Sequence, residues 1–216
     1  MSGKRRAGYT RFVPAPKPIQ PGEIVGSADQ RVFLHDFPWS HFEVILALRG
    51  DRSVPRMTYL RGELELMSPS QTHESISSLL GRLLELYALE RDVPLNAYGS
   101  WTVRHAPAER GVEPDKCYIV GDPRGRDRPD LAVEVIWTSG GLDKLEVHRG
   151  LGVPEIWIWR DAAIRVFRLQ GGRYEEAESS ELFPDIDLRL LARLAGYEIQ
   201  TQAIVEFRDW IRSAQR

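Results

Sequence analysis

The sequence predicts a single domain of mixed α/β (α+β) class, on the basis of length, composition and the order of its patterns. The chain has 216 residues, a usual size for one domain. Hydrophobic residues make up 42% and charged residues 28% of it, which is typical of a globular protein rather than of a disordered chain or a fibre. Helix and strand patterns follow in the order helix, hairpin, helix, strands, helix, strands, helix.

The N-terminal region differs in composition from the rest. It carries prolines at positions 14, 16, 18 and 21, with scattered charge and little apolar periodicity. We therefore interpret residues 1–34 as an extended or disordered arm. One folded domain is expected over residues 35–200, followed by a C-terminal helical extension over residues 201–216.

Apolar spacing and turn residues define the elements of the domain. Gly50 suits the end of a first helix, and Arg61-Gly62 suits a two-residue hairpin turn between two strands. Apolar residues recur at helical spacing from Ile76 to Tyr87 and predict one long helix. The predicted helices cover residues 36–50, 72–91, 142–150 and 201–212, and the predicted strands cover residues 56–60, 63–67, part of 95–105, 115–120, 131–137, 155–159 and 164–169.

Composition and charge exclude several classes of protein. No apolar run approaches the roughly 20 residues of a membrane span, and the N-terminus lacks the apolar stretch of a signal peptide. Cys117 is the only cysteine, so neither an intrachain disulfide nor a cysteine-ligated zinc site can form. The formal net charge of -2 argues against a uniformly basic nucleic-acid-binding surface. We expect a reduced, cytoplasmic protein that does not enter the membrane.

Glu134 is the most informative candidate for a functional residue. It stands inside the strand pattern LAVEVIW, and its neighbours on the same strand face, Ala132 and Ile136, are apolar. A continuous apolar run usually means that both faces of a strand are covered. Because charged residues are rarely buried without a partner or a metal ion, we favour a functional carboxylate over a solvent-facing one.

Asp115 is the second candidate. If strands 115–120 and 131–137 form an antiparallel hairpin, Asp115 lies opposite residue 134 or 136, and facing Cβ atoms are about 5 Å apart. Two carboxylates at that distance repel unless a cation lies between them, which suits Mg²⁺ or Mn²⁺. Asp130 is on the same face as Glu134 but about 13 Å along the strand, so it is the weaker candidate.

Three further residues are candidates for the same site. Lys144 is one of only four lysines and begins a helix just after the Glu134 strand, where it could orient a water or stabilise phosphate charge, or simply pair with Asp143 or Glu146. His73 and Glu74, in the first turn of the long helix, could supply a metal ligand or a proton-transfer group. The alternatives are a satisfied semi-buried histidine and an acid that favours a helix N-terminus.

The loop over residues 121–130 is rich in arginine. Arg124, Arg126 and Arg128 could hold phosphates of a nucleic acid, although a solvated turn explains them equally well.

Six pieces of the chain, by their order and spacing, resemble the restriction-endonuclease-like family within the PD-(D/E)xK nuclease superfamily. That family was formerly described as a domain of unknown function. The six pieces are MTYLRGELELMSPS at 57–70, His73, EPD at 113–115, PDLAVEV at 129–135, LDKL at 142–145 and GVPEIWIW at 152–159.

The resemblance implies a restriction-endonuclease-like core, a mixed central sheet flanked by helices, and a possible homodimer. It implies a metal site on Asp115 and Glu134. The superfamily lysine would stand at Ile136, and Lys144 matches a lysine moved to the following helix. His148 replaces a tyrosine that the family usually has. Residues 155–159 could extend a sheet across a dimer interface.

We therefore hypothesise a Mg²⁺- or Mn²⁺-dependent endonuclease acting on DNA. One alternative is an inactive nuclease-like module that binds nucleic acid or a protein partner. The other is a sugar hydrolase with a carboxylate pair, for which Trp157 and Trp159 would have to line a cleft.

Overall fold

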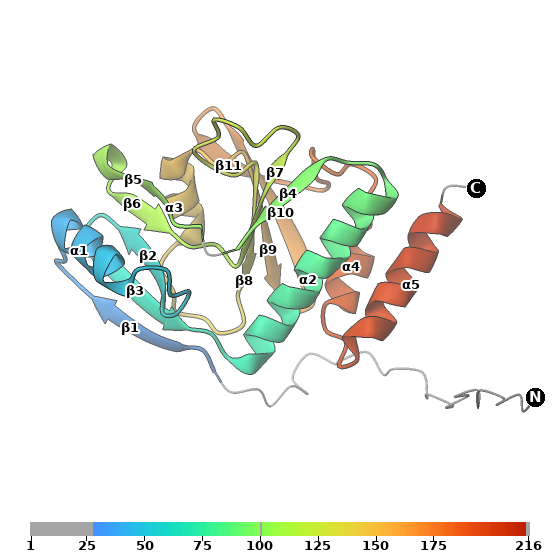
Figure 1. Ribbon diagram of the computed structural model, residues 1–216, viewed down its shortest axis with the longest axis horizontal. Helices are drawn as coiled ribbons and strands as arrows, with labels where there is room; N and C mark the ends of the chain where they lie inside the picture. Colours follow the sequence, from blue (N-terminus) through green and yellow to red (C-terminus); the bar gives the residue numbers. More distant parts are fainter. Residues whose placement is uncertain (1–27, 100, 215–216) are drawn as a thin grey trace, which may run out of the picture.

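The structure, a computed structural model, describes residues 28–99 and 101–214, which form two sheets and five α-helices (Figure 1). Sheet A has the strand order β1-β3-β2-β6-β5, and sheet B has the order β11-β10-β9-β8-β7-β4. The strands of sheet A are β1 Gln30–Leu34, β2 Arg56–Leu60, β3 Glu63–Ser68, β5 Val103–His105 and β6 Arg110–Val112. Those of sheet B are β4 Leu95–Tyr98, β7 Lys116–Val120, β8 Leu131–Val135, β9 Glu155–Arg160, β10 Ala163–Gln170 and β11 Arg173–Ala177. The helices are α1 Trp39–Arg49, α2 Gln71–Glu90, α3 Lys144–Leu151, α4 Leu188–Leu194 and α5 Gln200–Ser213, with a 3₁₀ turn at Ala106–Ala108.

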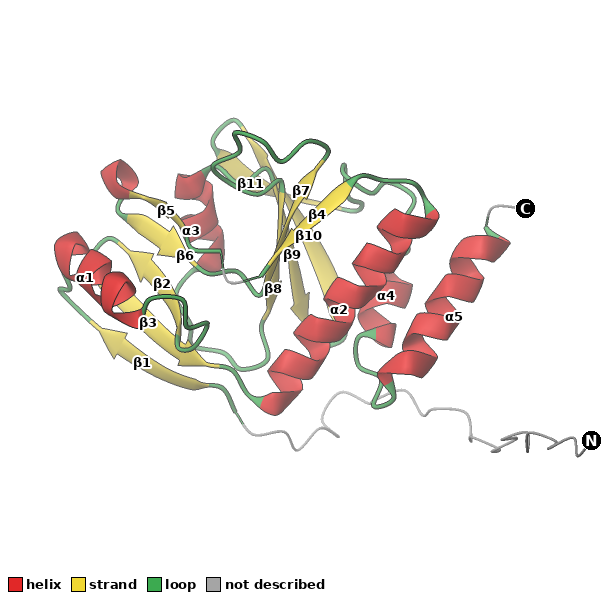
Figure 2. Cartoon of the chain, viewed as in Figure 1, coloured by secondary structure: helices red, strands yellow, loops and turns green. Residues whose placement is uncertain are grey.

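Sheet B is covered on both faces (Figure 2). Helices α2, α4 and α5 lie on one face, and α3 lies on the other, between sheet B and sheet A. This explains the apolar run of β8. Val133 and Val135 pack against α2 on one face of the sheet, and Ala132 packs against α3 on the other. The predicted α/β (α+β) class, with a mixed sheet and flanking helices, is confirmed.

The hairpin β2–β3 turns where the sequence predicts. Leu60 pairs with Glu63, and the two turn residues Arg61 and Gly62 have positive φ angles of 46° and 92°. Positive φ at both positions is the geometry of the tight turn that matches the twist of two antiparallel strands. The turn fixes the register of β3 and so decides which of its side chains face the interior.

The crossover from β8 through α3 to β9 is the one parallel connection between the described strands. Asp143 caps α3 by accepting a hydrogen bond from the Glu146 N–H at 3.1 Å, and Gly152 ends it in the left-handed conformation with φ 69°. Lys144 lies in this first turn, and its Nζ reaches to 3.6 Å from Oε2 of Glu134 on β8.

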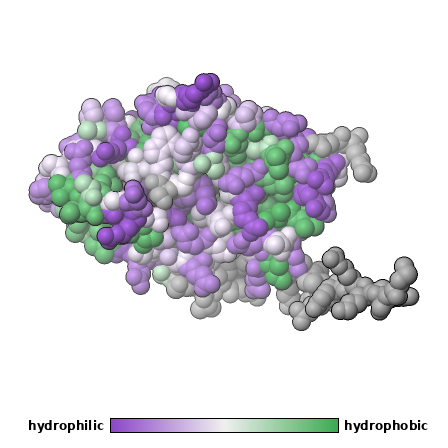
Figure 3. All heavy atoms as spheres, in the orientation of Figure 1, coloured by the Kyte–Doolittle hydropathy of each residue, from purple (hydrophilic) through white to green (hydrophobic). Residues whose placement is uncertain are grey.

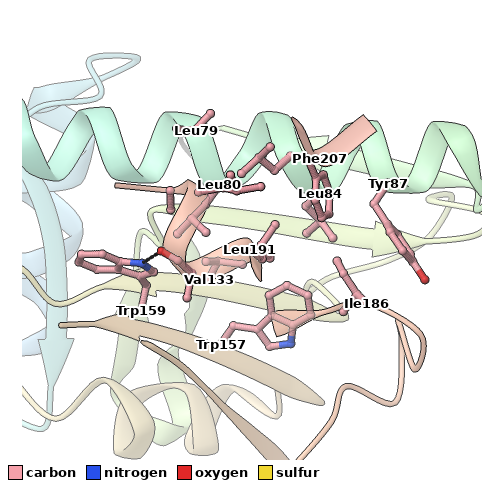
Figure 4. Close-up of a cluster of buried hydrophobic side chains, with 14 of the residues drawn as sticks. Leu79, Leu80, Leu84, Tyr87, Val133, Trp157, Trp159, Ile186, Leu191 and Phe207 are labelled. Atoms are coloured by element: carbon pink, nitrogen blue, oxygen red, sulfur yellow. Dashed lines mark hydrogen bonds between the residues drawn. The ribbon is translucent and has the colours of Figure 1, made fainter. Parts of the chain in front are cut away.

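The main core lies between α2 and sheet B (Figure 4). Trp159 donates a hydrogen bond from its indole nitrogen to the Ala192 carbonyl at 3.1 Å, which ties β9 to α4. Helix α2 approaches β7 closely at Gly81, where a Cβ atom would lie 3.1 Å from the Tyr118 hydroxyl. The labelled core side chains are Leu79, Leu80, Leu84, Tyr87, Val133, Trp157, Trp159, Ile186, Leu191 and Phe207.

Several elements differ from the sequence prediction. Residues 30–34, assigned to the arm, form β1 and pair with β3, whereas residues 1–27 of that arm lie outside the described residues. Strands β6 and β11 and helix α4 were not predicted, since each is short or mostly polar. Helix α5 packs on α2, and its Ala203 and Phe207 belong to the main core. The idea that residues 155–159 extend a sheet across a dimer is wrong, because β9 lies between β8 and β10.

The surface keeps some apolar side chains. On the face drawn in Figure 3, hydrophobic residues gather at the α1 end and over part of α2 and α5. Val44 and Leu48 on α1 are exposed. Among the helices of the described residues, none is long and apolar enough to cross a membrane.

Candidate active site

A cavity of about 160 Å³ lies where the two sheets meet, and we call it the acidic cavity. It brings together four predicted residues, Asp115, Glu134, Lys144 and His73. Three carboxylates (Glu65, Asp115, Glu134) and three cationic side chains (Arg31, Lys144, Arg160) line it. The other lining residues are Met67, Val135, Ile136, Thr138, Ser139, Gly140, Gly141 and Leu142.

Glu134 is buried, with 2% of its surface exposed. Its Oε1 accepts a hydrogen bond from His148 Nε2 at 2.6 Å, and its Oε2 lies 3.6 Å from Lys144 Nζ. Burial raises the pKa of Glu134, but the charge of Lys144 and the hydrogen bond from His148 together lower it by more. The net pKa of Glu134 is therefore below its usual value. The carboxylate is therefore ionised at neutral pH.

Lys144 points from the first turn of α3 back toward sheet A. Its ammonium donates a hydrogen bond to Thr58 Oγ1 on β2 at 2.8 Å, in addition to its contact with Glu134. Only 15% of the side chain is exposed. The lysine is thus a partly buried cation held beside a carboxylate, rather than a solvated surface charge.

Asp115 stands just before β7, and the pair Lys116–Val133 places it opposite Glu134 in the hairpin register. Its Oδ2 accepts a hydrogen bond from the Val135 N–H at 2.6 Å. Its Oδ1 contacts His73 Nε2 at 2.9 Å and also accepts from Arg56. The expected pairing of the two acids across neighbouring strands is therefore present, with both side chains in one cavity.

Cys117 lies two residues after Asp115, so its side chain is on the same face of the sheet as Asp115 and Glu134. Burial raises the pKa of the Cys117 thiol to about 12, and the charge of Glu134 contributes to that rise.

His73 connects Asp115 to a residue that the sequence did not single out. Its Nδ1 lies 3.1 Å from Asp29 Oδ2, and Asp29 Oδ1 accepts from the Ser70 N–H at 2.8 Å. Burial raises the pKa of Asp29, but the hydrogen bonds from His73 and Ser70 outweigh it and hold that pKa below its usual value. Asp29 fixes the ring of His73, which is 1% exposed, with Nε2 toward Asp115.

Glu65 is a second residue that sequence reasoning missed. It is 1% exposed, accepts from Arg31 Nε at 2.8 Å and accepts from the Leu142 N–H at 2.8 Å. The signal was present, because Glu65 stands between Leu64 and Leu66 in a strand, as Glu134 stands between two valines.

The structure does not bring Glu74 into the acidic cavity. Its side chain is half exposed on the outside of α2 and pairs with Arg56 at 2.5 Å. Its neighbour His73 points inward because successive helical residues are about 100° apart.

The arginine loop lies at the other end of the hairpin from Asp115. Five residues of β7 separate Asp115 from the loop, a length of about 16 Å. Arg124 pairs with Asp122, Arg126 pairs with Asp130, and Arg128 is half exposed. Asp130, the weaker of the candidate acids, accepts a hydrogen bond from the Val120 N–H at 3.0 Å at the end of this loop and does not line the acidic cavity.

The donors of the acidic cavity fit Mg²⁺ or Mn²⁺, since these ions prefer carboxylate oxygens. Residues 28–99 and 101–214 contain no group of three or more His, Cys, Asp or Glu that could hold a metal ion. Mg²⁺ commonly takes one or two carboxylates and completes its shell with water and substrate phosphate, so a site with fewer than three protein ligands is still compatible with this ion.

The sugar-hydrolase alternative loses its support. Trp157 and Trp159 are 1% and 3% exposed and belong to the main core. No Phe, Tyr or Trp of the described residues lines the acidic cavity, so it offers no stacking platform for a sugar ring.

Comparisons with known proteins bear on the family to which the chain belongs. A search of curated proteins found no match. One solved structure, titled "Crystal structure of a putative nuclease belonging to DUF820 from Anabaena variabilis ATCC 29413 at 1.96 A resolution", is 14% identical, with a TM-score of 0.44 over 73% of this chain and 92% of that chain. The model of the Uma2 family, described as "Putative restriction endonuclease", matches residues 39–200, three quarters of the chain and all the residues of the hairpin and of α3. The chain therefore belongs to the Uma2 family.

Proposed function

We propose that the protein is a divalent-metal-dependent endonuclease that hydrolyses phosphodiester bonds in DNA. The observation that carries the proposal is the convergence of Asp115, Glu134 and Lys144, from two neighbouring strands and the following helix, on one cavity. Membership of a restriction endonuclease family supports the same conclusion.

In this proposal Asp115 and Glu134 hold Mg²⁺ or Mn²⁺. The ion supplies a Lewis acid that polarises the phosphodiester and makes a bound water easier to deprotonate. His73 keeps the Asp115 carboxylate oriented through its 2.9 Å contact. Glu65 accepts a hydrogen bond from the Leu142 N–H and lines the same cavity, so it adds a third carboxylate to the wall of the site.

Lys144 acts on the reacting groups. Thr58 and Glu134 fix its ammonium on the wall of the cavity. From there it can donate a hydrogen bond to the attacking water and stabilise negative charge that develops on the phosphate oxygens. Arg124, Arg126 and Arg128 are proposed to contact the DNA backbone away from the cut, because their loop is at the far end of the hairpin.

Nicking of supercoiled plasmid tests the proposal. The wild type should nick DNA with Mg²⁺ or Mn²⁺ and not with EDTA, and D115N and K144M should lose at least a hundredfold in rate. R165Q is the matched control, since Arg165 pairs with Glu176 on the exposed side of β10 and β11. A wild type that cuts neither DNA nor RNA and shows no Mn²⁺ binding by calorimetry would refute it.

One observation favours a second function, an inactive nuclease-like module that binds nucleic acid or a protein. Each acid already has a cationic or histidine partner: Asp115 has Arg56 and His73, and Glu134 has Lys144 and His148. Such a module should bind duplex DNA in EDTA with a steep salt dependence, and D115N should bind as the wild type does. A homodimer stays a prediction, which sedimentation equilibrium checks.

A further inference from the structure

A second cavity, of about 380 Å³, borders the acidic cavity, and Asp115 lines both. We call it the flanking cavity. Its cationic lining side chains are Arg56 and Lys116. Its remaining lining residues are Ser53, Val54, Ser68, Pro69, Glu74, Gly99, Glu113 and Pro114.

The acids of the flanking cavity are already paired. Glu113 accepts from Arg49 Nη1 at 2.5 Å, and Glu74 accepts from Arg56 Nη2 at 2.5 Å. By contrast, no carboxylate of the described residues lies within ion-pair distance of the Lys116 ammonium. Lys116 and Lys144 are the lysines within the described part of the chain, and each lines one of the two cavities that share Asp115.

Arg56 lies at the boundary between the cavities. One terminal nitrogen donates to Asp115 Oδ1, and the other donates to Glu74. Asp115 Oδ1 also contacts His73 Nε2 at 2.9 Å, so that oxygen already has two partners. A divalent ion on the same oxygen must displace one of them, and it repels the guanidinium because both are cations. Once displaced, Arg56 is still held by Glu74 at the flanking cavity.

On the basis of the proposed nuclease function, we propose that the flanking cavity binds, through Lys116 and Arg56, the backbone phosphate next to the one that is cut. A divalent ion on Asp115 releases Arg56 for this contact. The ligand is a phosphodiester of the DNA strand. An arginine fork matches a phosphate in two hydrogen bonds, and a lysine without a carboxylate partner adds a point charge beside it.

The variants R56Q and K116Q test this exchange, in which Arg56 leaves Asp115 for the phosphate when the ion binds, and R165Q is the matched control. The probes are Mn²⁺ alone, measured by calorimetry, and a fluorescein-labelled 16-bp DNA duplex, measured by anisotropy in EDTA and in Ca²⁺. R56Q removes the competing cation and should lower the Mn²⁺ Kd at least threefold. K116Q should leave the Mn²⁺ Kd within twofold of the wild type.

The duplex separates the two residues further. K116Q should raise the duplex Kd in both conditions and reduce the salt slope of log Kd by about one, as expected for one lost phosphate contact. R56Q should raise the duplex Kd with Ca²⁺ but not in EDTA, where Asp115 holds Arg56. Plasmid nicking by either variant should show a higher KM with a smaller change in kcat.

Each result decides between the two proposals. The phosphate-binding inference fails if wild type binds Mn²⁺ but R56Q binds it no more tightly, or if K116Q leaves the duplex Kd and salt slope unchanged. If wild type binds no Mn²⁺ and cuts no nucleic acid, the nuclease proposal fails and the exchange fails with it. If R56Q does not fold, R56K, which keeps the charge but loses the fork, should raise the duplex Kd measured with Ca²⁺ above the wild-type value, and an unchanged Kd would overturn the role of Arg56.

Discussion

Replacing Glu134 with alanine should destabilise the fold as well as the site. The carboxylate is buried and lies 2.6 Å from His148 and 3.6 Å from Lys144. Its loss leaves a partly buried ammonium without its charge partner, and it leaves His148 with neither ring nitrogen bonded, since His148 Nδ1 already has no partner among the described residues. Breaking a buried pair in this way costs about 3–5 kcal/mol. For a chain of this size, that lowers Tm by about 6–20 °C.

Urea unfolding, followed by the fluorescence of the buried Trp157 and Trp159, measures the loss. The pKa of Glu134 is lowered in the folded state, so its contribution is fully present above its ordinary pKa of 4.5 and is lost as pH falls through the lowered value. The difference between wild type and E134A should therefore stay constant from pH 7 to about pH 5 and shrink in more acidic buffer. E134Q keeps the side-chain volume and isolates the effect of the charge.

A double-mutant cycle with K144M provides the sharpest check. K144M should destabilise the wild type, because it leaves Glu134 with one partner fewer, and should stabilise E134A, because it removes the unpaired ammonium. Equal effects of K144M in both backgrounds, or an E134A midpoint equal to that of the wild type, would refute the reasoning. E176Q, on the exposed pair with Arg165, should leave the midpoint nearly unchanged.

Three other regions lead to predictions. G81L should cost about 1–3 kcal/mol in urea unfolding, because a Cβ there already lies 3.1 Å from the Tyr118 hydroxyl; an unchanged midpoint would mean that α2 can move away from β7. Cys117, with its pKa raised to about 12, should react with iodoacetamide far more slowly in native buffer than in urea at pH 8, and equal rates would contradict its burial. Replacing the arginines of loop 121–130 with glutamine should raise the duplex Kd and leave the Mn²⁺ Kd unchanged, because the loop is about 16 Å from Asp115; a changed Mn²⁺ Kd would contradict this separation.

Much of the fold could be predicted from local signals. The long helix has an unbroken apolar stripe and a Ser70 cap that accepts from the His73 N–H at 3.2 Å. The hairpin turn at Arg61-Gly62 and the apolar run of β8 are equally local, and each is confirmed. The strand β1 could not be predicted, because its Val32 is exposed and its pairing with β3 depends on residues 30 to 38 positions away.

The site was predicted where chemistry and strand pattern coincide. Glu134 lies in β8 between apolar residues, Asp115 lies just before β7, and the register of the two strands places these acids opposite each other. Asp29 was missed because its partner His73 comes from another element, and only the assembled fold brings the two into contact. Glu65 was missed although its position between Leu64 and Leu66 resembles that of Glu134. Glu74 neighbours His73 in the sequence but lies outside the acidic cavity, because successive helical residues are about 100° apart. The arginine loop is about 16 Å along the strand from Asp115, and its contact with nucleic acid stays a prediction.

The partners of the two central acids decide what the site can do without a metal ion. A buried carboxylate must be paired, and here Arg56 and His73 pair Asp115, while Lys144 and His148 pair Glu134. The two carboxylates therefore have partners without the ion, and the same cations would compete with it. A divalent ion then binds more weakly than it would to two free carboxylates, and a phosphate that draws Arg56 away from Asp115 lowers that competition. Metal and DNA should accordingly bind cooperatively, each increasing the affinity for the other by the same factor.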